Sequence, residues 1–340
     1  MVRNYVILSG ENLELARAEV ISLVNLINPN ANVIWHDSFG LIESRIDVSI
    51  FLLNRAALVK ESGPVLAESF QFEELFESLS NETFSSCLDK SKSFCFRTYS
   101  LNQEIRIDRQ KVTIEFGTKI KNITNASVSL RNPDVNLTLF IGSNHATLCL
   151  SNQSTLRTQL RERKPGRKQF FHPSMMNSQL ARVMCNLAAI NETTTVLDPF
   201  CGGGGILCEA LLIGAKVIGI DMNWRLLKGA QTNLTDITGT EYTLLQSDAR
   251  TLPIKRCGSI VTDPPYGRAS STRGAIAKQL ISSTLTQSVE ILESNGTLCI
   301  CGSTELDISS MIDEIGVTRL HHIEVPVHRR LTREIISARI

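Results

Sequence analysis

Four short apolar runs in the second half of the 340-residue chain each lead to an aspartate. The runs at residues 195–197, 216–220, 243–245 and 259–261 lead to Asp198, Asp221, Asp248 and Asp263. Helical patterns separate the runs, and this alternation predicts a parallel, doubly wound α/β sheet. Such a sheet binds its ligand beyond the carboxyl ends of the strands, so these acids mark the expected site.

A glycine-rich turn follows the first of these strands. Asp198-Pro199-Phe200-Cys201 continues into four glycines at residues 202–205. Glycine lets the backbone approach a ligand closely and adopt a positive φ. The dinucleotide fingerprint G-x-G-x-x-G is incomplete, because counting from Gly202 and Gly204 places Leu207 at the third glycine. A Walker lysine is missing as well, so the turn indicates another ligand.

The acids point to a ligand with a cationic end. A carboxylate at the position of Asp198 pairs better with an ammonium than with a pyrophosphate, which favours S-adenosylmethionine. Asp221 is expected to hold ribose hydroxyls, and Asp248 to accept a hydrogen bond from the adenine amine. The residues predicted to bind this cofactor are Asp198, Phe200, Gly202, Gly204, Asp221, Met222, Asp248, Ala249 and Asp263.

The fourth strand ends in Asp263-Pro264-Pro265-Tyr266, and here the chain resembles S-adenosylmethionine-dependent methyltransferases that modify exocyclic amines of nucleobases. The lone pair of such an amine is delocalised into the ring, so the enzyme must orient the nitrogen and accept hydrogen bonds from its N–H groups. We expect Asp263 and the Pro264 carbonyl to be these acceptors, and the Tyr266 ring to stack on an unstacked base. Asp263, Pro264 and Tyr266 are therefore the predicted catalytic residues.

Composition leaves room for packed cores but gives no global electrostatic signal. Hydrophobic residues make up 42% of the chain and charged residues 20%, as in globular proteins. The net charge of +1 means that an anionic partner must meet a local basic patch. Nine cysteines without a C-x-x-C pair indicate reduced, mostly buried thiols. No signal peptide or membrane-spanning run is visible, so we expect a cytoplasmic protein.

The first half of the chain predicts an α+β unit. A strand at residues 5–8 and a helix at 13–24 are followed by a strand-like piece at 33–35 and a buried helix at 50–58. Short runs between residues 93 and 150 then surround one further helical pattern.

The whole chain resembles the archaeal tRNA (guanine-N2)-methyltransferases that act on the guanine at tRNA position 10. The match rests on residues 263–274, on 170–188 with Phe170-Phe171-His172-Pro173, and on His328 to Arg333. The runs at 94–97, 127–134 and 137–141 also look like a THUMP domain, the RNA-binding module of these enzymes. The resemblance implies a class I, Rossmann-like methyltransferase domain behind a ferredoxin-like and THUMP half, with mono- and then dimethylation of guanine N2 in tRNA.

The resemblance gives four regions: ferredoxin-like at 1–50, THUMP at 51–152, a basic linker at 153–172 and the methyltransferase at 173–340. An isolated basic run is as often a solvated face as a binding site, but beside an RNA-binding module phosphate contact is favoured. The predicted RNA-binding residues are Arg161, Arg163, Lys164, Arg167, Lys168 and Arg268.

Alternatives remain open at this point. Another THUMP-type guanine-N2 enzyme, a DNA adenine-N6 or cytosine-N4 methyltransferase, and a non-catalytic RNA-binding module share parts of the pattern. His172 lies between Phe171 and Pro173 and is expected to have a structural or cofactor-pocket role rather than to act as a base. We expect no metal site, because His321 and His322 have no cysteine or acid at ligand spacing, and we expect a monomer.

Overall fold

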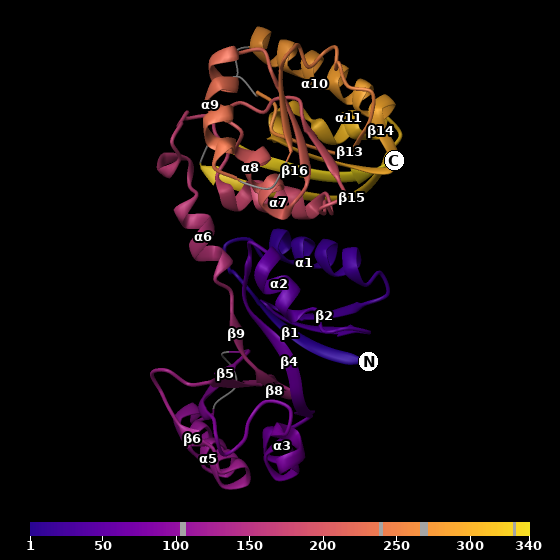
Figure 1. Cartoon of the computed structure of the whole chain (residues 1–340). Coiled ribbons are helices and arrows are strands. Elements are labelled where there is room, and N and C mark those ends of the chain that lie inside the picture. Colours follow the sequence, from indigo (N-terminus) through magenta and orange to yellow (C-terminus); the bar gives the residue numbers. More distant parts are fainter. Residues whose placement is uncertain (103–106, 238–240, 266–270, 329–330) are drawn as a thin grey trace. The chain divides into compact units, whose positions relative to one another are not determined.

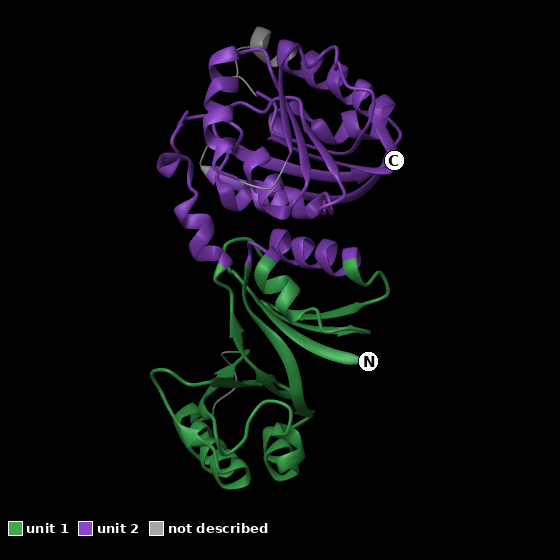
Figure 2. Cartoon of the chain, in the orientation of Figure 1, with its two compact units in different colours: residues 1–13, 27–54, 59–155 green, residues 14–26, 55–58, 156–340 purple. Residues whose placement is uncertain are grey.

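The computed structural model describes residues 1–102, 107–237, 241–265, 271–328 and 331–340. Two compact units divide the chain and are described separately (Figure 2). Unit 1 comprises residues 1–13, 27–54 and 59–155, and unit 2 comprises 14–26, 55–58 and 156–340.

Unit 1 is built on a nine-stranded sheet. Its order is β2-β3-β1-β4-β8-β7-β5-β6, with β9 paired to β4. The strands are β1 (Val2–Leu8), β2 (Asn32–His36), β3 (Phe39–Ser44), β4 (Val59–Ser69), β5 (Ser93–Ser100), β6 (Ser127–Val128), β7 (Val135–Ile141), β8 (Ala146–Leu150) and β9 (Asn152–Gln153). Strand β5 runs parallel to β6 and β7, and the other pairs are antiparallel.

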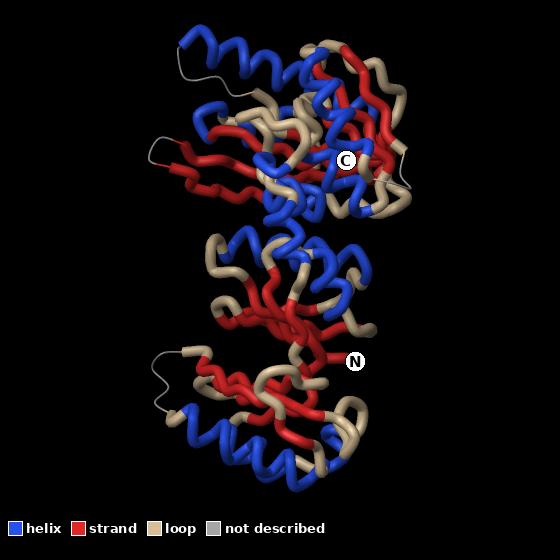
Figure 3. Tube along the Cα trace, turned by 60° about the vertical axis from the view of Figure 1, so that its left-hand side comes forward, coloured by secondary structure: helices blue, strands red, loops and turns tan. Residues whose placement is uncertain are grey.

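Three helices described between residues 72 and 124 pack on the part of this sheet that contains β5, β7 and β8. The helices of unit 1 are α2 (Ser49–Arg55), α3 (Phe72–Ser78), α4 (Asn81–Phe84) and α5 (Arg109–Thr124). Helix α5 begins after Asp108, whose side chain accepts hydrogen bonds from two backbone amides, and ends at Asn125 in the left-handed conformation. Phe116 of α5 stacks on Phe96 of β5 with ring centroids 5.6 Å apart, which packs the helix on the strands (Figure 3).

The predicted helix at residues 50–58 is too long. Helix α2 ends at Arg55, and β4 starts at Val59. The amides of Ala57 and Leu58 donate to the carboxylate of Glu19 at 2.8 and 2.9 Å, so they do not continue a helical ladder. The 11-residue strand β4 was not predicted at all.

Unit 2 is a seven-stranded, doubly wound sheet of order β12-β11-β10-β13-β14-β16-β15. The strands are β10 (Thr195–Asp198), β11 (Lys216–Asp221), β12 (Tyr242–Gln246), β13 (Cys257–Thr262), β14 (Leu292–Ser303), β15 (Thr318–His328) and β16 (Leu331–Arg339). Strands β10 to β14 are parallel, as predicted, and β16 inserts antiparallel between β14 and β15. The strand order reverses beside β10, which is where such sheets bind ligands.

Two groups of helices cover unit 2. The helices are α1 (Leu13–Ile27), α6 (Leu156–Glu162), α7 (Ser178–Leu187), α8 (Gly205–Ile213), α9 (Trp224–Thr235), α10 (Ser271–Ile291) and α11 (Ile308–Glu314), with short 3₁₀ turns at Pro165–Arg167 and Thr304–Leu306. Helices α10 and α11 bury their apolar residues in one core with strands β13 and β14. Helices α7, α8 and α9 pack in series, and Figure 1 shows α7 and α10 on opposite sides of the strands.

All nine cysteines are buried free thiols, as the sequence predicts. Among the described residues, no helix has the length and apolar character needed to cross a membrane.

Candidate functional site

The glycine turn joins β10 to α8 and is fixed by carboxylates. Asp198 is 2% exposed, and its Oδ1 accepts hydrogen bonds from the Thr262 hydroxyl at 2.7 Å and the Phe200 amide at 3.1 Å. Gly202 has a φ of 51° and Gly204 a φ of 79°, values that residues with a Cβ rarely adopt. These two glycines therefore allow the chain to turn sharply into α8.

Asp221, at the end of the neighbouring strand β11, holds the same turn from the other side. Its Oδ2 accepts a hydrogen bond from the Gly202 amide at 3.0 Å, and its Oδ1 accepts one from the Asn223 amide at 2.7 Å. A carboxylate oxygen has a second lone pair, so both oxygens can still accept hydrogen bonds from a ligand.

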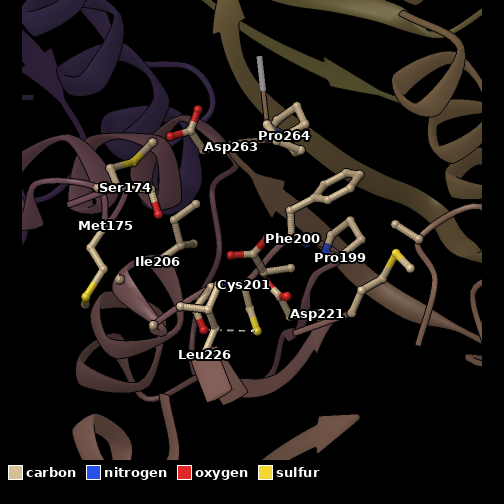
Figure 4. A pocket seen from close by; sticks show the side chains of 18 of the residues that line it. Ser174, Met175, Pro199, Phe200, Cys201, Ile206, Asp221, Leu226, Asp263 and Pro264 are labelled. Atoms are coloured by element: carbon tan, nitrogen blue, oxygen red, sulfur yellow. Dashed lines mark hydrogen bonds between the residues drawn. The ribbon is translucent and has the colours of Figure 1, made fainter. Parts of the chain in front are cut away.

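A cavity of about 610 Å³ opens beside this turn. Figure 4 shows Asp263 and Asp221 toward opposite ends of it, with Met175 on one side and Phe200 on the other. The predicted cofactor residues that line the cavity are Asp198, Phe200, Gly202, Asp221, Met222, Asp248, Ala249 and Asp263, and Pro264 lines it as well. The structure thus brings the ends of four strands to one cavity.

Gly204 does not line the cavity. A Cβ built on it would lie 3.3 Å from the Cβ of Ala230, so it faces helix α9 and serves the turn itself. Tyr266 and Arg268 lie outside the described residues.

Burial and neighbouring carboxylates make the cavity a site for a cation. Burial raises the pKa of Asp198 to about 7, against the lowering effect of the hydrogen bonds from Thr262 and Phe200, and nearby Asp263 and Asp221 raise it further. A bound ammonium or sulfonium would favour the ionised form of this carboxyl. The cavity therefore fits S-adenosylmethionine, which carries both groups, better than an anionic cofactor.

Asp248 is held in place at the cavity wall by an ion pair. The Arg250 guanidinium lies 2.6 Å from its Oδ2, and this hydrogen bonding holds the pKa of the Asp248 carboxyl below its usual range. The carboxylate is therefore ionised at neutral pH and can accept hydrogen bonds through both oxygens.

Asp263 lies beside the Cys301 thiol, which was not among the predicted site residues. Burial raises the pKa of the Cys301 thiol, and the adjacent Asp263 carboxylate raises it further, while Arg333 opposes the shift. Arg333 of β16 also lines the cavity. Arg333 was not predicted as a site residue, although the resemblance placed it in the closing motif at residues 328–333.

The segment at residues 173–176 is a further part of the cavity wall that was absent from the predicted site. Pro173, Ser174, Met175 and Met176 all line it, directly after the Phe170-Phe171-His172 stretch. His172 shares a short hydrogen bond of 2.6 Å with the exposed Ser174 hydroxyl.

The basic segment divides into exposed and engaged cations. Arg161, Lys164 and Arg167 are exposed. Arg163 instead pairs with the buried carboxylate of Glu209, at 3.0 and 3.1 Å, and Arg182 pairs with the same carboxylate at 2.9 Å.

Lys168 is half-buried, and its positive charge lowers the pKa of the Cys208 thiol against the larger effect of burial. Two of the five described cations predicted to meet RNA thus interact with groups inside unit 2.

The chain matches known methyltransferases over nearly its full length. The model of the RMKL-like methyltransferase domain matches residues 165–333, and that of a DNA methylase matches 40–232. The tRNA (guanine(10)-N2)-dimethyltransferases of Methanothermobacter thermautotrophicus and Methanocaldococcus jannaschii are 30% and 31% identical to it, over 97% of both chains in each comparison. The chain belongs to the tRNA (guanine(10)-N2)-dimethyltransferase family.

Membership of this family makes the chain an S-adenosylmethionine-dependent methyltransferase. The crystal structure of TrmN from Thermus thermophilus shares its fold, with a TM-score of 0.56 and 17% identity over 99% of both chains. The DNA methylase match ends at residue 232 and so covers the glycine turn but not Asp263, which lies 31 residues further on.

Proposed function

We propose that this enzyme transfers one and then a second methyl group from S-adenosylmethionine to N2 of the guanine at position 10 of tRNA. The observation that carries the proposal is the relatedness to tRNA (guanine(10)-N2)-dimethyltransferases over 97% of the chain. The acidic cavity and the Asp263-Pro264 turn supply the chemistry that such a transfer needs.

Each carboxylate of the cavity has a proposed part in cofactor binding. Asp198 would pair with the cofactor ammonium, Asp221 would accept hydrogen bonds from ribose hydroxyls, and Asp248 would accept one from the adenine amine. Phe200, Met222, Ala249 and the Gly202 backbone would surround the rest. The cofactor supplies an electrophilic methyl group on a sulfonium.

Asp263 and Pro264 orient the acceptor nitrogen. A guanine N2 has two N–H groups, and the Asp263 carboxylate and the Pro264 carbonyl would each accept a hydrogen bond from one of them, which aims the lone pair at the methyl group. The sulfonium leaves as the neutral thioether S-adenosylhomocysteine, and the methylated nitrogen releases one proton to solvent. A single N–H then remains, so one acceptor still positions the nitrogen for the second transfer. Tyr266 is assigned the stacking of the base from the sequence alone.

The exposed cations Arg161, Lys164 and Arg167 are proposed to contact tRNA phosphates, with Arg268 assigned from the sequence. We propose that residues 1–50 are ferredoxin-like, 51–152 a THUMP domain, 153–172 the linker and 173–340 the catalytic domain. The first of these boundaries lies within α2. We further propose a cytoplasmic monomer, the compartment following from the tRNA substrate.

Methyl incorporation into tRNA and duplex DNA tests the proposal. Purified protein with radiolabelled S-adenosylmethionine should label tRNA and leave DNA unlabelled, and Asp263→Ala should abolish labelling. Asp313→Ala, on the surface of α11, is the matched control and should behave as the wild type. Labelled DNA with unlabelled tRNA would favour the DNA amino-methyltransferase instead.

A further inference from the structure

Residues 169–176 cross the glycine turn and form one wall of the cofactor cavity, and we call them the strap. They contain neither helix nor strand. A Cβ on Gly203 would lie 2.7 Å from the Met175 sulfur, and one on Gly205 would lie 3.3 Å from the Met176 carbonyl oxygen. The strap therefore lies directly against the turn, where a Cβ on Gly203 would displace the Met175 side chain and one on Gly205 would contact the strap backbone tightly.

Asn233 of helix α9 joins the strap to the turn. Its Oδ1 accepts a hydrogen bond from the Phe170 amide at 3.0 Å, and its Nδ2 donates to the Phe170 carbonyl at 3.0 Å and to the Gly203 carbonyl at 2.9 Å. The residue is 9% exposed. A carboxamide is suited to this place because it offers one acceptor and two donors, whereas an ionised Asp can only accept.

The same face of α9 holds the strap at two further points. Gly229, one turn before Asn233, packs against the Phe170 ring so closely that a Cβ there would lie 2.2 Å from a ring carbon. The Gln169 amide donates to Asp236 Oδ2 at 2.7 Å, just beyond the end of the helix.

Asn233 itself is not part of the cavity wall, but the strap residues Pro173 to Met176 are. We propose that Asn233 is a positioning residue for the cofactor, because it fixes the strap over the glycine turn and so forms this wall before the cofactor binds. A strap that had to be ordered at the moment of binding would weaken affinity through its lost conformational entropy. The inference rests on the proposed function only in that the cavity takes S-adenosylmethionine.

Calorimetric titration of the full chain with S-adenosylmethionine, without tRNA, tests the inference. Asn233→Ala should raise the Kd by about tenfold, the loss expected when hydrogen bonds of ordinary strength no longer organise the wall. The KM for the cofactor should rise in parallel, while kcat at saturating cofactor and tRNA stays within about twofold, since no group at the reacting atoms has changed.

Asn191→Ala is the matched control. The Asn191 side chain likewise makes three hydrogen bonds, accepting them from the Thr193 amide, the Thr193 hydroxyl and the Thr194 hydroxyl, but in the loop before β10 and away from the cavity. This variant should lose comparable stability and keep the wild-type Kd. An equal change of Kd in both variants, or an unchanged Kd in Asn233→Ala, would overturn the inference.

Gly229→Ala perturbs the same strap through a different residue and serves as the test if Asn233→Ala does not fold. It keeps Asn233 and favours the helix, but its methyl group displaces the Phe170 ring. We expect the same rise in Kd, and a double variant little weaker than either single one, because both act through one segment. A wild-type Kd in Gly229→Ala contradicts the inference. If the wild-type protein does not methylate tRNA but these differences in Kd are observed, the proposed function is refuted and the inference about the strap stands.

Discussion

Replacing Asp198 by Asn should make the free protein more stable while weakening cofactor binding. Asp198 is 2% exposed and its pKa is raised from 3.8 to about 7, mainly by burial. Between these values the folded protein holds a proton that the unfolded chain has released, so this group reduces stability as pH rises. A shift of about 3 pKa units corresponds to about 4 kcal/mol at and above pH 7, an upper limit on the stability that the substitution would recover.

Urea unfolding of the wild type and Asp198→Asn across the pH range measures this cost. The free energy of unfolding of Asp198→Asn should exceed that of the wild type by an amount that grows by about 1.4 kcal/mol per pH unit between about pH 4 and pH 7 and then levels off. The amide that replaces the carboxyl can still accept the hydrogen bonds from Thr262 and Phe200, so the variant should keep the native fold.

Cofactor affinity should rise with pH over the range in which the free wild-type protein loses stability. If the ionised Asp198 holds the cofactor ammonium, wild-type affinity should rise about tenfold from pH 6 to pH 8 as the carboxyl loses its proton. The Asp198→Asn variant should bind weakly and with little pH dependence over this range. Wild-type affinity in the variant, or a stability gain that does not vary with pH, would contradict this role of Asp198.

Three further changes test the turn, the buried ion cluster and the basic segment. Gly204→Ala should cost about 1–2 kcal/mol in urea unfolding because of its φ of 79°, whereas Gly166→Ala, with open space around it, should cost little. Glu209→Gln should cost about 3–5 kcal/mol in the same assay, because two arginines lose their buried partner. The third change converts the exposed cations to alanine. They are Arg161, Lys164 and Arg167. Filter binding of tRNA should then weaken and show a shallower salt dependence, with cofactor affinity unchanged.

The acids of the site were predictable because parallel strands end at one edge of a sheet. Asp198, Asp221, Asp248 and Asp263 each follow an apolar run, so local pattern was enough to place them at one cavity. Of the strap, only His172 was given a possible place in the cofactor pocket. The wall that residues 173–176 form was not predicted, because the strap is held by Asn233, some 60 residues further along the chain.

The predictions that the structure contradicts also failed because of contacts between residues far apart in the sequence. Strand β4 contains Gly63 and Pro64, which argue locally against a strand. In the structure, Gly63 lies so close to the neighbouring strand β8 that a Cβ on it would be 1.8 Å from the Leu150 carbonyl oxygen. The basic segment gave no sign that Arg163 turns inward, because its partner Glu209 lies in another helix. Local sequence thus predicted the parallel strands of unit 2 and the acids that follow them, while pairing between distant segments decided the remainder.

Position-resolved nucleoside analysis is the most direct test of the proposed function. Unmodified tRNA transcript incubated with protein and S-adenosylmethionine would be digested to defined fragments and analysed by mass spectrometry. We expect N2-methylguanosine and then N2,N2-dimethylguanosine in the fragment that carries guanine 10, and neither product after Asp263→Ala. Methyl groups on another nucleotide or another atom, or unmodified tRNA from a protein that binds the cofactor, would contradict it.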